Sequence, residues 1–251
     1  MAATDGVRVA AIADTHLRKP VAGTFRTAFK ELGGQADLLL LAGDLTNGGT
    51  LEEIDILGRE VQDIPVPAIA VLGNHDHDEG HGDLMRSTLE GAGVRVLEGD
   101  AMALDVAGVR VGIAGVMGGS GGFPGAGTYP AVDDGNPEHQ ARIRRGPEDA
   151  RKLRAALDAL DCDVPIALMH FSPVPDTLVG EPPQIYPGLG CHQLGAAVDG
   201  GGAHLAIHGH AHSGTENGQT PGGVPVRNVA YPVLRQPYAI YHLIHGQVLR
   251  L

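Results

Sequence analysis

The sequence contains no tryptophan, and aromatic residues make up only 4% of its 251 residues. A hydrophobic core must therefore be built from Val, Leu, Ile and Ala side chains, in a chain long enough to bury a sizeable one. Cysteine is also scarce, because Cys162 and Cys191 are the only two and neither belongs to a C-x-x-C pattern. We therefore expect two reduced thiols rather than a disulfide framework.

Long apolar runs are absent as well. No uninterrupted stretch approaches the roughly 18 residues that a membrane-spanning helix needs. The amino terminus reaches a strand-like run at Val7 without the charged and then apolar pattern of a signal peptide. These absences predict a cytoplasmic protein with no membrane partner.

Positive charge is in the minority, with 18 Lys and Arg against 30 Asp and Glu and a formal net charge of −12. Such a surface repels the phosphate backbone of nucleic acids, so non-specific binding to DNA or RNA is not expected. A small anionic substrate remains possible if the site itself is cationic.

The 38 glycines and 17 prolines alternate with apolar runs, which indicates tight turns rather than disorder. Strand-like runs at 7–13, 37–42 and 66–72 alternate with helix-like stretches at 21–32 and 51–61, followed by one at 84–89. This order predicts parallel strands joined by right-handed crossovers. No repeat or break in composition divides the chain, so we expect a single domain over residues 1–251.

The pattern changes beyond residue 90. Short strands at 94–97, 101–106 and 109–114 favour an antiparallel or mixed extension of the sheet. A Gly-rich insertion at about 115–146 reads as a long loop or cap, and a helix at 147–160 has Pro147 near its start. A Pro-rich excursion at 172–190 interrupts the remaining strands, which are predicted at 165–169, 203–207, 224–229, 238–244 and 248–251.

Five of the strand-like runs end in residues that bind metals or move protons. These clusters are Asp14-x-His16, Gly43-Asp44, Gly73-Asn74-His75-Asp76, His170 and Gly209-His210-x-His212. The carboxyl ends of strands are where open α/β sheets place their sites. Residues two apart on an extended backbone point the same way, so Asp14 can converge with His16, and His210 with His212, if the backbone stays extended. The neighbouring glycines fit a sharp turn or a close approach of backbone to an ion.

This ordered set resembles the calcineurin-like metallophosphoesterase family, whose pattern is D-x-H, G-D-x-x, G-N-H-[D/E], a later H and G-H-x-H. The resemblance spans residues 14–212, and its compact size and G-N-H-D motif are similar to those of bacterial cyclic-nucleotide phosphodiesterase-like members. It implies an α/β (α+β) fold, a four-layer αββα sandwich of two mixed β-sheets flanked by helices.

The resemblance also implies a centre of two divalent ions, with Mn²⁺, iron and Zn²⁺ all compatible with the ligands. Asp14, His16 and His212 would hold one ion, and Asn74, His170 and His210 the other. Asp44 would bridge the two ions as a catalytic ligand. His75 would be a second catalytic residue, acting as a non-ligand acid or as a stabiliser of the transferring phosphoryl group.

The implied reaction is hydrolysis of a small-molecule phosphodiester or phosphomonoester by a metal-bridging hydroxide. Two divalent ions outweigh the carboxylates of Asp14 and Asp44, so the site stays positive inside an acidic protein. One residue departs from a branch of the family. Asn47 stands where purple acid phosphatases have a tyrosine ligand, so a tyrosinate-bound ferric site is not expected.

Three alternatives stay open within this resemblance. The chain could be a nuclease or a protein phosphatase of the same family, although the lack of a basic stripe counts against a nuclease. It could also be a metal-binding scaffold without catalysis, against which the intact ligand set and His75 argue.

Several other residues have two readings. Arg142, Arg144 and Arg145 either grip a phosphate or form the solvent face before a helix. Arg18 and Lys19 are candidate substrate contacts on similar grounds.

For a second set of residues, we expect a structural role rather than a functional one. His208 is expected behind the ligands rather than among them, and Asp76 is expected to support its turn. The run 77–81, which contains two histidines and two acids, favours a solvated loop over a third metal site. Cys191 next to His192 lacks the context of a nucleophile pair.

Overall fold

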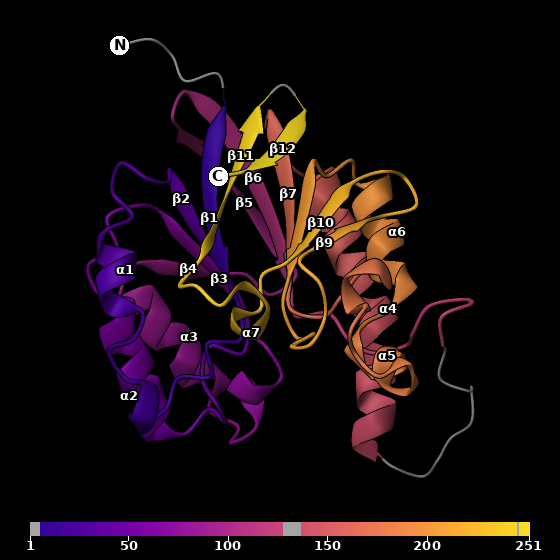
Figure 1. The fold of residues 1–251 in the computed structure, drawn as a ribbon, viewed down its shortest axis with the longest axis horizontal. Helices are drawn as coiled ribbons and strands as arrows, with labels where there is room; N and C mark the ends of the chain where they lie inside the picture. The colour runs from indigo at the N-terminus through magenta and orange to yellow at the C-terminus, as the bar shows by residue number, and fades with distance from the viewer. Residues whose placement is uncertain (1–5, 128–136, 245) are drawn as a thin grey trace.

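The structure is a computed structural model that describes residues 6–127, 137–244 and 246–251. Two six-stranded sheets pack face to face, and helices cover the outer surface of each, which gives four layers (Figure 1). The two sheets lie side by side between a group of amino-terminal helices and a group of later ones. The predicted αββα sandwich of mixed sheets is confirmed.

The first sheet has the order β12-β11-β1-β2-β3-β4. Neighbours from β1 to β4 are parallel, as the alternation of strands and helices predicted, whereas β11 and β12 pair antiparallel. The strand bounds are β1 Val7–Ile12, β2 Leu38–Ala42, β3 Ala68–Val71, β4 Val94–Val96, β11 Ala239–Ile244 and β12 Gln247–Arg250.

The second sheet has the order β5-β6-β7-β8-β10-β9, with parallel pairs in the centre and an antiparallel pair at each edge. The strand bounds are β5 Asp100–Val106, β6 Val109–Val116, β7 Val164–Met169, β8 Leu205–His208, β9 Asn217–Gln219 and β10 Pro225–Asn228.

Aliphatic side chains fill three layers. Alternate residues of one strand serve two of them, because Leu40 of β2 packs between the sheets while Leu39 and Leu41 pack under the helices. The third layer lies between the second sheet and its own helices and includes Leu153 and Leu157. Burial on both faces explains why the central strands read as continuous apolar runs.

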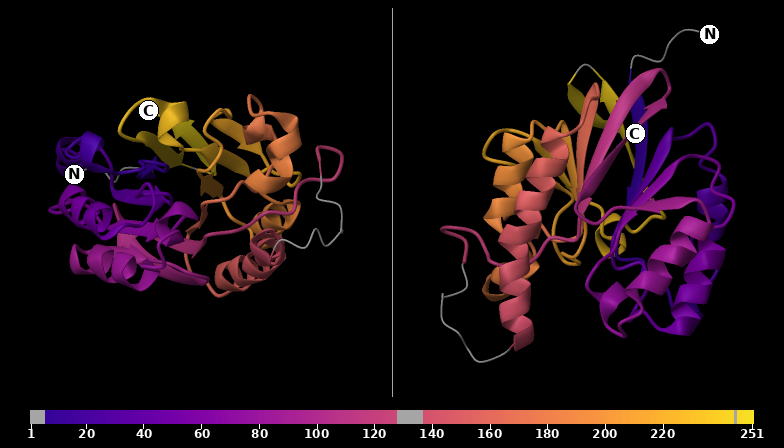
Figure 2. Two further views of the ribbon diagram at one scale, coloured as in Figure 1. Left: turned by 90° about the horizontal axis from the view of Figure 1, so that it is seen from below. Right: turned by 180° about the vertical axis from the view of Figure 1, so that it is seen from behind.

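The helices divide between the two outer surfaces (Figure 2). The first sheet is covered by α1 Arg26–Lys30, α2 Leu51–Glu60 and α3 Gly82–Gly91, and the second by α4 Pro137–Asp158 and α6 His192–Gly200. Short segments complete the chain: α5 Tyr186–Leu189, α7 Tyr231–Leu234, and the 3-10 turns η1 Lys19–Val21, η2 His75–His77, η3 Asp176–Leu178 and η4 Pro183–Ile185.

The predicted helix at 21–32 is wrong in length, since only Arg26–Lys30 is α-helical. Gly23 has a left-handed φ of +86° that interrupts the helix pattern. The carboxylate of Glu60 then accepts the backbone N–H groups of Phe25 and Arg26, at 2.9 and 2.8 Å, and so fixes where the helix begins.

The predicted loop at 115–146 is also wrong at both ends. Strand β6 extends to Val116, and α4 begins at Pro137, so that Pro147 lies well inside the helix rather than near its start. A proline is tolerated in the first turn, and Pro137 is the one that occupies it. The part of the predicted loop at 128–136 lies outside the described residues. Helices α6 and α7 and strand β9 were not predicted.

No helix in the described part of the chain is both long and apolar enough to cross a lipid bilayer.

Candidate metal centre

The five predicted clusters meet at one edge of the sandwich, at the carboxyl ends of parallel strands from both sheets. Asp14, Asp44 and Asn74 follow β1, β2 and β3 of the first sheet. His170 follows β7 and His210 follows β8 of the second sheet. The clusters that the sequence separates by up to two hundred positions therefore share one site, because strand ends converge at the seam between the sheets.

The first group of candidate ligands is Asp14, His16 and His212, whose ligand atoms lie within 4.8 Å of one another. Nε2 of His212 lies 2.9 Å from Oδ1 of Asp14 and 3.3 Å from Nε2 of His16. The other oxygen of Asp14 accepts the backbone N–H of His210 at 2.8 Å. A cation at the centre of this group would meet one carboxylate and two imidazoles.

The second group is Asp44, His170 and His210, within the same 4.8 Å limit. Nε2 of His170 lies 3.2 Å from Oδ2 of Asp44 and 3.2 Å from the amide oxygen of Asn74. The His170 ring is fixed from behind, because its Nδ1 lies 2.9 Å from the carbonyl oxygen of Ala42. This contact directs Nε2 into the group. In metal-binding histidines, a hydrogen bond to the second ring nitrogen commonly orients the ring in the same way.

Asp44 lies between the two groups. Its Oδ1 accepts the backbone N–H of His75 at 2.9 Å, while its Oδ2 lies 4.0 Å from Nε2 of His16 in the first group. This Oδ2 is buried and accepts no well-aligned hydrogen bond from the described residues. Its near neighbours are imidazole nitrogens of both groups, His170 at 3.2 Å and His16 at 4.0 Å, and a cation between carboxylate and imidazole would satisfy all of them. The residues present therefore fit a pair of bound cations.

The backbone at the site is not extended, contrary to the prediction for Asp14 and His16 and for His210. Left-handed φ values occur at Asp14 (55°), His16 (41°), Asp44 (49°) and His210 (69°). Such conformations are uncommon for residues other than glycine, and they concentrate at functional sites. The side chains converge because the chain turns sharply at the strand ends, not because positions two apart alternate along a strand.

Two glycines allow the loops to approach the carboxylates. A Cβ atom on Gly73 would lie 2.1 Å from Oδ1 of Asp44, and one on Gly209 would lie 2.3 Å from Oδ2 of Asp14. Both distances are far below van der Waals contact. The backbone makes a close approach at these glycines, and the atom it approaches is a carboxylate oxygen.

Asp76 holds two of the loops together. Its buried carboxylate accepts the backbone N–H groups of Leu45, Thr46 and Gly73 and the hydroxyl of Thr46, at 2.8–3.2 Å. Asp76 therefore supports its turn, as predicted, and fixes the loop of Asp44 against that of Asn74. Burial, reinforced by the charge of Asp44, raises the pKa of Asp76 to about 6.

The pKa values of the histidines in the two groups depend on burial and on the neighbouring carboxylates. Burial opposes the charged form of His170, but the adjacent carboxylate of Asp44 outweighs it and raises the pKa of His170 to about 9. Burial lowers the pKa of His210 well below its ordinary value. The hydrogen bond to Asp14 raises the pKa of His212. Without a metal, protons thus occupy part of the space between carboxylate and imidazole that a cation would take.

His75 belongs to neither group of candidate ligands in the described part of the chain. Its ring lies 5.1 Å from that of His16, and its Nδ1 lies 2.9 Å from Oδ2 of Asp78. Because the imidazole is partly exposed, it can meet a molecule bound over the centre. Sequence reasoning placed Asp78 in a solvated loop and did not pair it with His75, although a spacing of three residues on a 3-10 turn was a usable signal.

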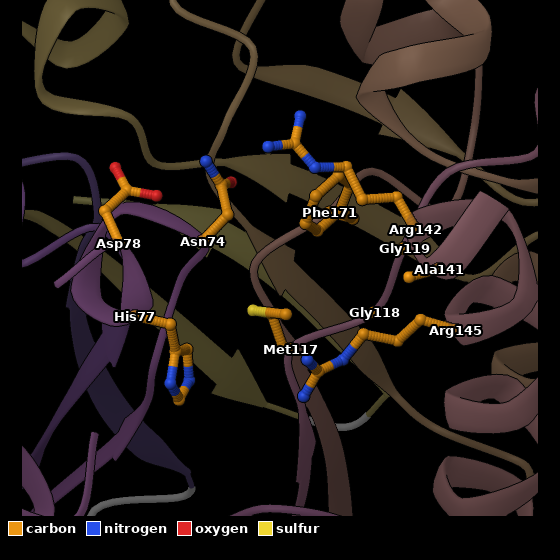
Figure 3. A pocket seen from close by; sticks show the side chains of 10 residues that line it. All are labelled: Asn74, His77, Asp78, Met117, Gly118, Gly119, Ala141, Arg142, Arg145 and Phe171. Carbon is orange, nitrogen blue, oxygen red and sulfur yellow. The ribbon is translucent and has the colours of Figure 1, made fainter. Parts of the chain in front are cut away.

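A pocket of about 190 Å³ adjoins the centre (Figure 3). Asn74, His77 and Asp78 form one side, and Arg142 and Arg145 of α4 form the other. Its remaining walls are Met117, Gly118, Gly119, Ala141 and Phe171. Four of these wall residues belong to the segment 115–146, which the sequence predicted as a loop or cap, whereas the helical form of residues 137–146 was not predicted.

The other basic candidates lie elsewhere. Arg144 does not line this pocket. Arg18 donates to Oδ1 of Asn47 at 2.6 Å, and exposed Lys19 pairs with Glu52 at 3.5 Å.

His208 and Cys191 have structural surroundings. His208 is buried with Nε2 2.8 Å from the hydroxyl of Thr177, and it lies outside both candidate ligand groups of the described residues. Burial lowers the pKa of His208 to about 3 and raises that of Cys191 to about 11. Neutral His208 and protonated Cys191 agree with the structural readings of both residues.

Among known structures, the chain is similar to phosphopantetheinyl hydrolase (PptH) from Mycobacterium tuberculosis, with a TM-score of 0.65 and 17% identity over 92% of this chain and 91% of that one. TT1561 of Thermus thermophilus matches with a TM-score of 0.64 and 16% identity over 98% of both chains. GAP50, described as the anchor in the inner membrane complex of Plasmodium, matches with a TM-score of 0.58 and 11% identity over 98% and 84%. At these low sequence identities, the TM-scores show a shared fold alone. No curated protein gives a significant sequence match.

The sequence model of one family, described as calcineurin-like phosphoesterase, matches residues 7–214. This range includes all five clusters and most of both sheets. The chain therefore belongs to the calcineurin-like phosphoesterase family.

Proposed function

We propose that the protein is a hydrolase of small-molecule phosphate esters with a centre of two divalent metal ions. The observation that carries the proposal is the position of Asp44. Its buried Oδ2 accepts no well-aligned hydrogen bond from the described residues and lies 3.2 Å from Nε2 of His170 and 4.0 Å from Nε2 of His16, so it faces both groups of candidate ligands. A carboxylate in this position can be shared by two cations, one in each group. Family membership is the second support.

Asp14, His16 and His212 would hold one ion, Asn74, His170 and His210 the other, and Asp44 both. Two such ions supply Lewis-acid stabilisation of the phosphoryl group and activation of water. Imidazole, carboxylate and amide ligands suit Mn²⁺, iron and Zn²⁺, so the ligand set alone does not choose among them.

The protein's own residues would orient the substrate and protonate its leaving oxygen. Nδ1 of His75 lies 2.9 Å from Oδ2 of Asp78 without a well-aligned hydrogen bond, and the imidazole lies beside the ligand groups without belonging to either in the described chain. His75 would then protonate the leaving oxygen or stabilise the transferring group, a role worth on the order of 10²–10⁴-fold in rate. Its backbone N–H, bonded to Asp44, fixes the loop that carries the imidazole.

The intact ligand set and the position of His75 favour an enzyme over a metal-binding scaffold. General-acid assistance uses a group near the substrate that is not occupied as a ligand, and His75 lies outside both ligand groups of the described residues. A scaffold that only bound metal would have no use for a partly exposed imidazole beside the ions.

The test is Asp44→Asn, assayed on bis(p-nitrophenyl) phosphate with added Mn²⁺, together with elemental analysis of the metal content. We expect metal content to fall and hydrolysis to drop by more than about a hundredfold. Asp63→Asn is a matched control, because Asp63 also has a left-handed φ, of 65°, but lies exposed beside Lys30. Full metal content with retained activity in Asp44→Asn would disprove the bridging role.

A further inference from the structure

We infer that the pocket between η2 and α4 binds a second anionic group of the substrate, apart from the phosphoryl group that is hydrolysed. The inference deepens the proposed function and rests on it. It assigns the substrate to phosphate esters that carry another phosphate or a carboxylate.

The first argument is position. Asn74 lines the pocket and also points its amide oxygen toward His170 of the second ligand group. A molecule bound at the metal centre can therefore extend directly into the pocket. Figure 3 shows Arg142 reaching past Phe171 toward Asn74 from α4.

The pocket lies beside the centre rather than over it. Its lining includes Asn74 but none of His16, His75 and His212. The two arginines are therefore placed for a group next to the reacting phosphorus. This position distinguishes a second anion from the scissile phosphoryl group itself.

The second argument is charge. Nε of Arg145 donates to Oδ2 of Asp149 at 3.2 Å, and this carboxylate also accepts Nζ of Lys152 and the backbone N–H of Gly118, both at 3.1 Å. Asp149 thus fixes Arg145 without neutralising it, since Lys152 shares the same carboxylate. The terminal nitrogens of Arg145 remain for a ligand.

The side chain of Arg142 is exposed and makes no hydrogen bond or ion pair with the described residues. On the opposite wall, Asp78 is the one carboxylate among the described residues that line the pocket. Two guanidinium groups thus face a single carboxylate, so the lining carries a net positive charge. Guanidinium groups bind phosphate and carboxylate through paired N–H donors.

The third argument is size. A volume of about 190 Å³ is below the roughly 300–1,000 Å³ of pockets that hold a whole ligand. It is several times the ~30 Å³ of one water molecule, which is enough for a phosphate or carboxylate with some solvent. The pocket therefore accepts one group of a substrate whose reacting part lies at the metal centre.

The experiment measures competitive inhibition by phosphonates, whose carbon–phosphorus bond the enzyme does not hydrolyse. Propylphosphonate, phosphonopropanoate and the ethane, propane and butane bisphosphonates are compared as inhibitors of bis(p-nitrophenyl) phosphate hydrolysis at a buffered Mn²⁺ concentration. We expect the best bisphosphonate to bind roughly ten- to a hundredfold more tightly than propylphosphonate. Phosphonopropanoate shows whether a carboxylate serves as the second anion.

The decisive variant is Arg142→Gln, in which this preference should disappear. Arg144→Gln is the matched control, because it removes the same charge from a neighbouring position that does not line the pocket. Equal inhibition by mono- and bisphosphonates in the wild-type protein would overturn the inference. A preference that survives in Arg142→Gln, or that Arg144→Gln weakens as much, would also overturn it.

Failure of the proposed function would look different. In that case the Mn²⁺-loaded protein hydrolyses no phosphate ester, and the same phosphonates are compared by calorimetric binding. A preference for two anions that depends on Arg142 would still support the subsite, and its absence would overturn it.

Discussion

The sequence predicted which residues form the site but not their backbone conformations. The motif letters identified Asp14, His16 and Asp44, and the structure brings them together with the imidazoles of the second sheet. Their left-handed backbone angles could not be read from the alternation of a strand, because they arise from loops held by tertiary contacts such as those of Asp76. Local patterns give the residue type, and contacts distant in sequence set its geometry.

His75 provides the residue-scale test. It lies beside both ligand groups of the described chain without belonging to either, so His75→Ala should retain both metals. Turnover of bis(p-nitrophenyl) phosphate should fall on the order of 10²–10⁴-fold, because a proton donor beside the leaving oxygen is removed. Stopped assays and elemental analysis of the same preparation provide the measurement.

Asp78→Asn serves as the comparison for this variant. It removes the charge that faces Nδ1 of His75 while keeping the imidazole, so its loss of turnover should be smaller. If His75→Ala instead releases a metal ion, His75 is a ligand and the assignment is wrong.

Individual elements show which patterns are informative. Helix α2 was predicted within one residue from its apolar stripe, and the structure shows that Thr50 and Glu53 form a capping box at its start. Helix α1 was predicted too long, because the group that defines its start is Glu60, which lies at the end of a different helix. Periodicity cannot reveal a carboxylate that is more than thirty positions away in sequence.

Glu60→Ala tests this contact. The side chain is buried, at 2% exposure, and accepts backbone N–H groups ahead of α1, including that of Gly23. Removing it leaves buried donors unsatisfied, so the free energy of unfolding should fall by about 2–3 kcal/mol. Urea denaturation followed by circular dichroism gives the value.

Glu52→Gln is the control on the same helix, where the side chain is exposed and pairs with Lys19, and it should leave stability unchanged. A Glu60→Ala protein as stable as the wild type would show that α1 does not depend on this carboxylate.

At the scale of the whole molecule, the class of fold was predicted from a resemblance, because the ordered ligand motifs matched those of a family with a known fold. The strand order within each sheet was not predictable from local patterns. For example, β11 pairs with β1 across more than two hundred positions, and no local pattern in either strand predicts this pairing. The pairing depends on burial between the two sheets, where Val9 and Tyr241 pack in the same apolar layer.

The site itself joins the two sheets. Asp44 and Asn74 follow strands of the first sheet, whereas His170 and His210 follow strands of the second. Bound cations would therefore connect the two halves of the sandwich and should stabilise the whole fold. The unfolded chain lacks this arrangement, so binding adds to the free energy of unfolding.

At a metal concentration a hundredfold above Kd, the linkage amounts to about 2.7 kcal/mol. For a chain of this size we expect the midpoint of thermal unfolding to rise by roughly 5–10 °C when Mn²⁺ is added to chelator-treated protein. The Asp44→Asn variant should show a much smaller rise, because its bridging oxygen is lost, whereas Asp63→Asn should match the wild type. If Mn²⁺ raises the midpoint equally in all three proteins, the stabilising ions bind outside the site, and the two sheets are not joined through Asp44.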